Sequence, residues 1–372
     1  MKGSATQNVI RVLVGALLVA LFAGSIAVIT ARSAHASAEL HELYRGARAQ
    51  AMGNAFTAVA DDEEAIFYNP AGLAGVPGFR MTYFDEVTEV STDSLKAITD
   101  NIALFNDFNI SKLNALMGEN IYMRSQFTPS FVLPNFGFSV IIDDQFALNL
   151  KNQALPNTTL GYQQTNGVQV ATGFSILPKS RRSKTDLRVG FAGKMLWRRG
   201  GYRELSLPEL LSLNQSTLSE GAGPFERGMG IDLGVQGIRQ VTDSISFSAG
   251  GAFQNIGDVE FGPKGDPLKS TLNLGVAATY KQRLIKTTLA LDERHVLESA
   301  DFRKKMHMGL EFALPIVSVY GGLSETNLSY GATVDLWYFR VSALTYSEEL
   351  STYAGQDSSR RYMFRIAAKF GF

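Results

Sequence analysis

A pattern of alternating apolar and polar residues recurs along most of the chain, and it limits this sequence to a protein built mainly from β-strands. In the segment 228–239 the two faces are Met229, Ile231, Leu233 and Val235 against Gly228, Gly230, Asp232 and Gly234. Such alternation places one face of a strand in apolar surroundings and the other in polar ones. Arginine at Leu233 should therefore be destabilising, whereas serine at Gly190, on the polar face of the segment 186–198, should have a milder effect.

Counting such segments predicts about fourteen strands. Most have 8–12 residues, enough for a tilted strand to cross a bilayer, whereas strands of soluble proteins average about 5–6 residues. The sequence therefore predicts an all-β fold, a transmembrane antiparallel β-barrel with lipid outside and a polar lumen. A soluble β-sandwich is the alternative. The predicted strands are 79–84, 132–142, 145–152, 167–176, 186–198, 228–239, 244–254, 271–281, 286–293, 305–314, 316–323, 328–338, 339–347 and 361–372.

The connections between these segments alternate between short and long. A short connection is predicted at Asp143-Asp144, and the longest ones at 85–131 and 199–227. Bacterial outer-membrane barrels have short periplasmic turns and long outer loops. Both ends of the predicted barrel should therefore lie on the periplasmic side, with the long loops outside the cell.

The first 36 residues are typical of a secretory signal peptide. Lys2 and Arg11 precede the apolar run 12–30, and Ala34-His35-Ala36 offers a cleavage site after Ala36. A retained transmembrane helix is the alternative, because the run is long enough to span a bilayer. Secretion and a barrel together indicate the outer membrane of a Gram-negative bacterium.

Composition excludes several other classes. The chain has 35 basic and 35 acidic residues, so it lacks the basic excess of a nucleic-acid-binding protein. It has no cysteine, which excludes disulfides, thiolate metal sites and a lipoprotein anchor. No metal-binding histidine spacing and no Gly-x-Ser-x-Gly sequence occurs. We therefore expect no enzyme activity, metal or cofactor.

The chain ends on an alternating strand with an aromatic last residue. Tyr362, Phe364, Ile366, Ala368, Phe370 and Phe372 share one face. This ending resembles the C-terminal signal that the barrel-assembly machinery recognises in outer-membrane proteins. Phe370 and Phe372 are therefore the expected assembly signal.

Residues 37–78 do not alternate, and their sequence motifs resemble those of a known family. They contain Gly46-Ala47-Arg48, Met52-Gly53, the stretch 55–62 (Ala-Phe-Thr-Ala-Val-Ala-Asp-Asp) and the stretch 69–73 (Asn-Pro-Ala-Gly-Leu). This pattern is similar to the N-terminal segment of the FadL/PorV superfamily of outer-membrane barrels, with wording closest to the PorV/PorQ branch.

The resemblance implies that residues 37–78 fold as a hatch inside a barrel formed by residues 79–372. A barrel of this size is also wider than its own side chains can fill. Asp61 and Asp62 are either a solvated turn or helix cap, or partners of lumen bases such as Arg188, Lys194, Arg365 and Lys369. The candidate hatch residues are Gly53, Phe56, Asp61, Asp62, Asn69, Pro70 and Ala71. The candidate polar lumen residues are Arg188, Lys194, Asp232, His307, Glu311, Arg365 and Lys369.

Two predicted outer loops carry apolar residues at helical spacing, in the segments 91–117 and 205–218. Both are predicted to form short amphipathic helices. They are either lids that bury their own apolar side or an apolar groove for a hydrophobic ligand or a protein partner. The candidate ligand-binding residues are Ile102, Phe105, Phe108, Leu113, Leu210, Leu211 and Leu213.

Two functions follow from the resemblance. The first is the passage of hydrophobic small molecules, fatty-acid-like or aromatic, through the plugged lumen. The second is a PorV-like outer-membrane anchor or shuttle that binds secreted proteins without transport. Transport needs a continuous apolar path, whereas docking needs only an exposed rim. Either form would contact outer-membrane lipid, and neither requires a cofactor or nucleic acid.

Overall fold

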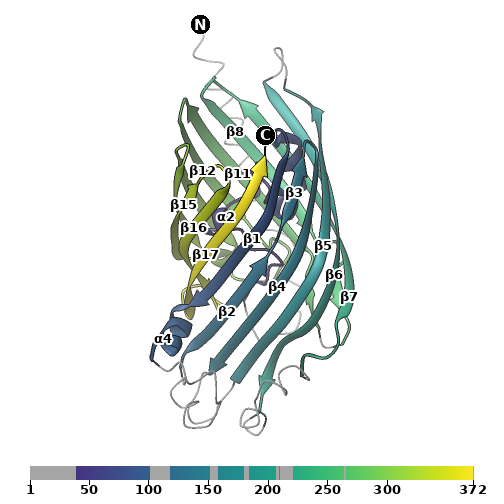
Figure 1. Ribbon diagram of the computed structural model, residues 1–372, viewed down its shortest axis with the longest axis vertical. Coiled ribbons are helices and arrows are strands. Elements are labelled where there is room, and N and C mark those ends of the chain that lie inside the picture. The colour runs from purple at the N-terminus through teal and green to yellow at the C-terminus, as the bar shows by residue number, and fades with distance from the viewer. Residues whose placement is uncertain are drawn as a thin grey trace.

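The computed structural model describes residues 39–100, 118–150, 158–179, 184–206, 209, 221–263 and 265–371, and the predicted signal peptide lies outside them. These residues form a closed antiparallel β-barrel of fourteen strands (Figure 1). The first strand, β1 (Arg80–Ser91), pairs with the last, β17 (Ser358–Gly371), so the sheet has no free edge. A closed barrel pairs its backbone groups internally, as lipid requires. The predicted fold class is confirmed.

Neighbouring strands follow chain order around the barrel, and β2 and β3 together make one strand because both pair with β1 and with β4. A separate hairpin consists of β9 (Val259–Phe261) and β10 (Gly265–Leu268). The remaining barrel strands are β2 (Asn120–Phe127), β3 (Ser130–Leu133), β4 (Phe136–Leu150), β5 (Thr158–Leu177), β6 (Thr185–Leu205), β7 (Glu226–Gln240), β8 (Ile245–Gln254), β11 (Thr271–Gln282), β12 (Ile285–Glu293), β13 (Met306–Ala313), β14 (Val317–Ser324), β15 (Asn327–Asp335) and β16 (Phe339–Glu349).

The first strands of the barrel, from β1 to β4, differ from the prediction. The predicted loop 85–131 contains the end of β1, the helix α4 (Thr92–Asp100) and the strand β2. The predicted turn at Asp143-Asp144 is wrong, because β4 runs through it. Asp143 faces the lumen, where its carboxylate accepts hydrogen bonds from Arg124 Nε at 2.5 Å and Gln145 Nε2 at 2.7 Å. The predicted number of strands is nevertheless fourteen, because β2 was missed and β4 was predicted as two strands, 132–142 and 145–152.

The second predicted long loop, 199–227, is shorter than expected. β6 continues to Leu205 and β7 begins at Glu226, so the connection is 206–225. The pairs Gln164–Arg199 and Gly161–Tyr202 extend the ladder between β5 and β6 beyond the predicted strand end. Polar residues can continue a strand here because this end of the wall carries them on both faces.

The two faces of the barrel wall differ in polarity as the alternation predicted. Along β7, Met229, Ile231 and Val235 are 65%, 59% and 52% exposed, whereas Asp232 is 1% exposed. Outward apolar side chains occur on every side of the barrel, while buried charged side chains line the lumen. An apolar outer wall of this kind suits the hydrocarbon of a bilayer. None of the described helices is long and apolar enough to cross a membrane.

The two ends of the barrel carry different connections (Figure 1). β1 begins and β17 ends at one end, which we call the terminus end. Its connections are 134–135, 178–184, 241–244, 283–284, 314–316 and 336–338. The opposite, loop end carries α4 and the connections 151–157, 206–225, 255–270, 294–305, 325–326 and 350–357.

Residues 39–78, which we call the inner segment, lie inside the barrel (Figure 1). The segment contains the short helices α2 (Ala47–Ala51), α3 (Ala65–Tyr68) and η1 (Pro70–Gly75). α2 contacts β14 to β17, and η1 contacts β4 to β7 across the lumen. Most of its side chains are buried, so the inner segment supplies the core that a barrel of this width lacks on its own.

Candidate functional site

The backbone of the inner segment rests on glycines of the barrel wall. At the turn formed by Asn69, Pro70 and Ala71, a Cβ atom on Gly190 of β6 would lie 2.2 Å from Ala71 N. A Cβ atom on Gly234 of β7 would lie 2.2 Å from Asn69 Oδ1. Backbone atoms cannot rotate out of the way, so a side chain at Gly190 would displace the turn. The sequence analysis expected serine at Gly190 to have a mild effect and did not foresee this contact.

Two further contacts of this kind hold the inner segment on other sides of the lumen. A Cβ atom on Gly322 of β14 would lie 2.2 Å from Gly53 N, and one on Gly250 of β8 would lie 2.6 Å from Thr57 O. Gly53 itself has a φ of 62°, which favours glycine. Glycine on the wall therefore allows backbone-to-wall contact at three places, and these contacts fix the segment from Met52 to Ala71.

The side-chain amide of Asn69 connects two parts of the inner segment with β7 of the barrel wall. Its Nδ2 donates to Thr57 O at 2.9 Å and to Val235 O at 3.0 Å, while its Oδ1 accepts from Ala71 N at 3.2 Å. Pro70 begins η1, where a missing N–H costs no hydrogen bond. The Asn-Pro pair is thus a fully hydrogen-bonded turn against the wall.

Ion pairs hold the inner segment at the terminus end. Arg48 lies 2.6 Å from Asp61, 2.7 Å from Asp62 and 2.7 Å from Glu311 of β13. Lys286 of β12 lies 2.8 Å from Asp61. Asp61 and Asp62 form ion pairs, but with Arg48 and Lys286 and none of the four bases named from the sequence. Asp62 Oδ1 also accepts a hydrogen bond from Glu64 N at 3.0 Å at the start of α3, as the helix-cap alternative expected. Phe56 packs below the Arg48 guanidinium, 5.0 Å from it.

Arg365 of β17 forms a second buried cluster. Its guanidinium contacts Asp85 of β1 at 2.7 Å and, on the inner segment, Glu64 at 2.8 Å and Glu63 at 3.3 Å. Removing one partner of a buried charge pair typically costs about 3–5 kcal/mol, because the other charge is left unpaired. Arg365 is therefore a structural link between the closing strands of the barrel and the inner segment.

A third cluster lies towards the loop end. Glu39 contacts Arg45 and Arg361, each at 2.9 Å. Arg294, which follows β12, lies 2.6 Å from Glu42. Charged side chains thus cross the lumen above and below the short helices. The described residues leave no continuous apolar path through the barrel in this conformation.

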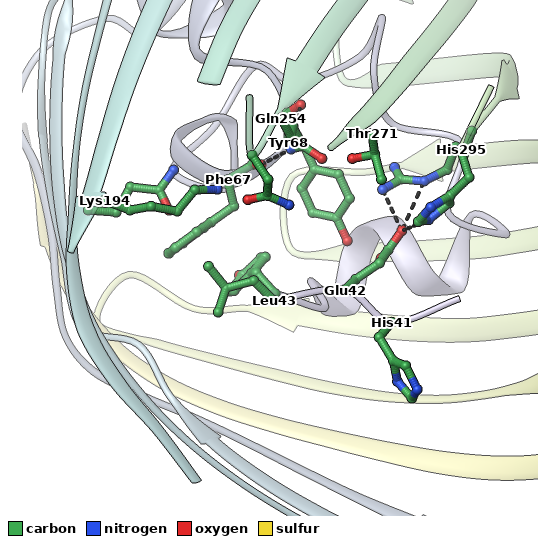
Figure 2. Close-up of a pocket in the computed structure, with 13 residues that line it drawn as sticks. His41, Glu42, Leu43, Phe67, Tyr68, Lys194, Gln254, Thr271 and His295 are labelled. Carbon is green, nitrogen blue, oxygen red and sulfur yellow. Dashed lines mark hydrogen bonds and ion pairs between the residues drawn. The ribbon is translucent and has the colours of Figure 1, made fainter. Parts of the chain in front are cut away.

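A small cavity lies beside the inner segment on its loop-end side (Figure 2). Its volume is about 30 Å³, enough for only a water molecule or two. Figure 2 shows Leu43, Phe67 and Tyr68 between Lys194 on one side and His295 on the other. Tyr44 stacks on Phe67 with ring centroids 3.9 Å apart. The lining therefore combines aromatic and apolar groups of the inner segment with polar groups of the wall.

The hairpin β9–β10 folds inward above this region. Val259 and Phe261 are fully buried, and the Arg198 guanidinium lies 4.6 Å from the Phe261 ring centre. Arg198 Nη1 also donates to Asp266 O at 2.9 Å. The connection 255–270 therefore covers part of the lumen. Its alternating Val259 and Phe261 are the sequence signal that could have indicated this.

A larger cavity, of about 240 Å³, lies at the terminus end. Its lining is almost entirely polar: Arg48, Asp61, Asp62, Arg80, Glu311, Ser318, Tyr320, Thr333, Asp335, Arg340, Ser342 and Arg365. Charged and hydroxyl side chains suit water rather than a hydrocarbon. The two cavities are thus different in character and lie on opposite sides of the inner segment.

The remaining predicted lumen residues do not form one site. Lys194 and Asp232 form a buried pair at 2.8 Å. Arg188 lies 2.7 Å from Asp186, and Lys369 pairs with Asp335. His307 Nδ1 lies 2.9 Å from Gly53 O, a hydrogen bond between the wall and the inner segment. No group of three or more metal-ligating side chains occurs in the described ranges.

The predicted ligand-binding loop residues cannot be placed. Ile102, Phe105, Phe108, Leu113, Leu210, Leu211 and Leu213 all lie outside the described residues, as does Phe372. The amphipathic helix predicted within 91–117 is present from Thr92 to Asp100 as α4. Phe370 points outward and is half exposed.

No family model and no curated protein matches the chain. Solved barrels resemble it at low sequence identity. The Pseudomonas putida toluene transporter TodX is 11% identical, with 89% of this chain and 99% of that chain covered and a TM-score of 0.47. The Ralstonia pickettii toluene transporter TbuX is 13% identical, with the same coverage and a TM-score of 0.47. CymD, a monoaromatic hydrocarbon channel, is 9% identical, with 88% and 97% covered and a TM-score of 0.41.

Proposed function

We propose that this chain is an outer-membrane barrel of the FadL/PorV superfamily in a Gram-negative bacterium, and that it passes hydrophobic small molecules, fatty-acid-like or aromatic. The observation that carries this proposal is the lining of the loop-end cavity. Leu43, Tyr44 and Phe67 present apolar and aromatic surface there, in a lumen otherwise crossed by ion pairs. Four of the thirteen lining residues are apolar or aromatic and nine are polar or charged, so a hydrophobic ligand would contact the inner-segment side of the cavity.

Passage requires part of the inner segment to move, because the cavity of about 30 Å³ is too small for such a ligand. The segment from Met52 to Ala71 rests on wall glycines through its backbone. Within the described ranges, residues 41–45 have no wall glycine against their backbone; they contact the wall through side chains such as Glu42 and Arg45 and through hydrogen bonds to wall side chains. We therefore expect residues 41–45 to move first and residues 52–71 to act as the fixed part of a hatch.

TodX, TbuX and CymD are described as transporters or channels for toluene or monoaromatic hydrocarbons. The proposal agrees with these descriptions but is based on the side chains around the cavity. We propose no catalytic role for the chain. The polar cavity at the terminus end has no place in the binding of a hydrocarbon, so release on that side would require further rearrangement.

A PorV-like docking function is the second candidate, and one observation favours it. The clusters around Arg48, Arg365 and Arg45 cross the lumen, so the described residues show no continuous apolar path. A protein that only anchors secreted partners at its loop end needs no such path. The resemblance of the inner segment's sequence motifs to the PorV/PorQ branch is compatible with this role.

Uptake assays with a panel of fatty acids and aromatic hydrocarbons test the proposal. Leu43→Ser should lower uptake by removing apolar surface from the cavity, at about 25 cal/mol per Å² of lost contact. Leu297→Ser is the matched control, because Leu297 is an exposed leucine at the same end that does not line the cavity.

A second variant separates the two functions. Serine at Phe105, Phe108, Leu210 and Leu211 should weaken ligand capture if these loops deliver a hydrophobic compound. If the wild-type chain takes up no member of the panel, and the loop variant loses a secreted partner in a pull-down, docking is the function and transport is wrong.

A further inference from the structure

Three neighbouring turns at the terminus end expose apolar and aromatic side chains. They connect β11 to β12, β13 to β14 and β15 to β16, so they follow one another along the same part of the wall. Trp337 is 92% exposed, the highest value for a large apolar residue within the described ranges. We call these residues the apolar rim: Leu284, Leu314, Ile316, Leu336, Trp337 and Tyr338.

The strands beside the apolar rim are too short to cover the hydrocarbon of a bilayer alone. β13 and β14 have 8 residues each and β15 has 9. At about 3.3 Å per residue, 8 residues span about 26 Å along the strand, or about 20 Å of height at a tilt of about 40°. The apolar band of outer-membrane barrels is about 25 Å tall. These strands therefore fall short by about 5 Å.

The missing height lies at the terminus end. At the loop end, β14 and β15 are joined by a polar turn at Glu325 and Thr326. The Glu325 carboxylate is buried there and accepts a hydrogen bond from Glu349 N at 2.7 Å. This turn carries no apolar side chain, and the exposed apolar residues of the loop end in this sector, Leu297, Phe302 and Tyr353, lie in the separate connections 294–305 and 350–357. At the terminus end, by contrast, the outward row Val334, Leu336 and Trp337 continues directly from strand into turn.

We propose that the apolar rim inserts into the boundary between headgroups and acyl chains of the phospholipid leaflet at the terminus end. Tryptophan and tyrosine favour this boundary because they have an apolar ring and a polar tip. The exposed Lys281 and Arg283 adjoin the rim and can contact lipid phosphates. The β11–β16 side of the barrel therefore ends within the leaflet and does not project into the periplasm. The inference assumes that the barrel is in a membrane, which the test below examines separately.

Tryptophan fluorescence tests this placement, because the chain has two tryptophans, Trp197 and Trp337. In Trp197→Phe, all emission comes from Trp337. The full chain is reconstituted into phosphatidylcholine vesicles whose acyl chains carry bromine either near the headgroup or near the bilayer centre. We expect blue-shifted emission, severalfold stronger quenching by the shallow bromine than by the deep one, and weak quenching by aqueous acrylamide.

Two reporters calibrate the measurement in a Trp197→Phe, Trp337→Phe background. Leu310→Trp places the reporter at the middle of β13, and Tyr353→Trp places it on the exposed connection 350–357. Leu310→Trp should respond most to deep bromine, and Tyr353→Trp only to acrylamide. Heat-modifiable migration in gels confirms that each variant forms the barrel.

If Trp337 behaves like the Tyr353→Trp reporter, the apolar rim lies in water and the inference is wrong. Protection of Trp337 from brominated lipid and from acrylamide alike would also overturn the inference, because protein would then cover the apolar rim. If the Leu310→Trp reporter is insensitive to brominated lipid, the membrane location itself fails and the proposed function falls with it.

Discussion

Replacing Gly190 with alanine should loosen the inner segment without harming the barrel wall. Gly190 lies on β6 and faces the turn at Pro70 and Ala71. The added Cβ atom would meet Ala71 N at 2.2 Å, whereas ordinary contacts begin at 3.4 Å. The turn must therefore shift by more than 1 Å, or β6 must bend away from it.

The energetic cost follows from the kind of atoms involved. Overpacking of a close contact typically costs about 1–3 kcal/mol when backbone has to move. A shift of the turn also lengthens the hydrogen bond from Asn69 Nδ2 to Val235 O, now 3.0 Å. The ladder between β6 and its neighbours is untouched, because a Cβ atom does not interfere with backbone pairing. We therefore expect Gly190→Ala to lower the free energy of unfolding by about 1–3 kcal/mol and to release the turn.

Two measurements detect this effect. Urea unfolding in detergent, followed by gel migration, gives the stability of the barrel. Conductance across a planar bilayer reports whether ions pass a displaced inner segment. The control is Gly193→Ala on the same strand, since a Cβ atom at Gly193 would have no neighbour within 4 Å. Equal stability and equal conductance for the two variants would refute the reasoning that wall glycines hold the inner segment.

Three further predictions concern the wall, a loop and assembly. Leu310→Arg, at the outward middle of β13, should cost about 2–4 kcal/mol in vesicle-based unfolding, and a cost equal to that of Leu310→Ala would contradict the assigned lipid face. Burial alone would lower the pKa of His295, but Glu298 and Glu42 outweigh it and raise the pKa to about 9. Protonated His295, paired with Glu298 and Glu42, therefore stabilises the fold fully below about pH 6.5. This contribution, at most about 3 kcal/mol, is lost as pH rises through 9. In His295→Gln the unfolding free energy should fall less between about pH 6 and pH 10 than in the wild type. An equal fall would count against ion pairing of His295 with Glu298 and Glu42. Phe372→Asp should lower the amount of heat-modifiable barrel in the outer membrane, and normal levels would argue against an assembly signal at the C-terminus.

Alternation predicted most of the wall because each face of a barrel strand has one uniform environment along its length. It failed at Asp143 and Asp144, where adjacent carboxylates resemble a turn. The group that neutralises Asp143 is Arg124, on the next strand of the barrel. Nothing local in the sequence indicates this partner, so a buried ion pair was interpreted as an exposed connection.

The inner segment shows the same limit. Its composition indicated close packing, and the Asn69-Pro70 pair indicated a turn. Asp61 pairs with Arg48, 13 residues away, and also with Lys286, which is 225 residues away and is brought near only by the closed barrel. The inward fold of 255–270 depended on a space beneath Phe261 that only the closed barrel defines. Many lumen-facing charges pair with residues distant in the chain, and the alternation of apolar and polar residues does not identify those partners.

The seam of the barrel has a consequence for how the molecule is made. β1 follows the inner segment directly, and β17 is the last strand, so the ring closes between the earliest and the latest strands of the chain. Glu39 and Arg361, which pair across this distance, are 322 residues apart. Contacts between such distant residues form late and slowly. Arg361 and Arg365 lie on β17 and pair with Glu39 and Glu64, so the strand that closes the ring also binds the inner segment. Closure of the ring and binding of the segment therefore stabilise each other, and a chain that lacks the partners of Arg361 and Arg365 should close its ring less readily.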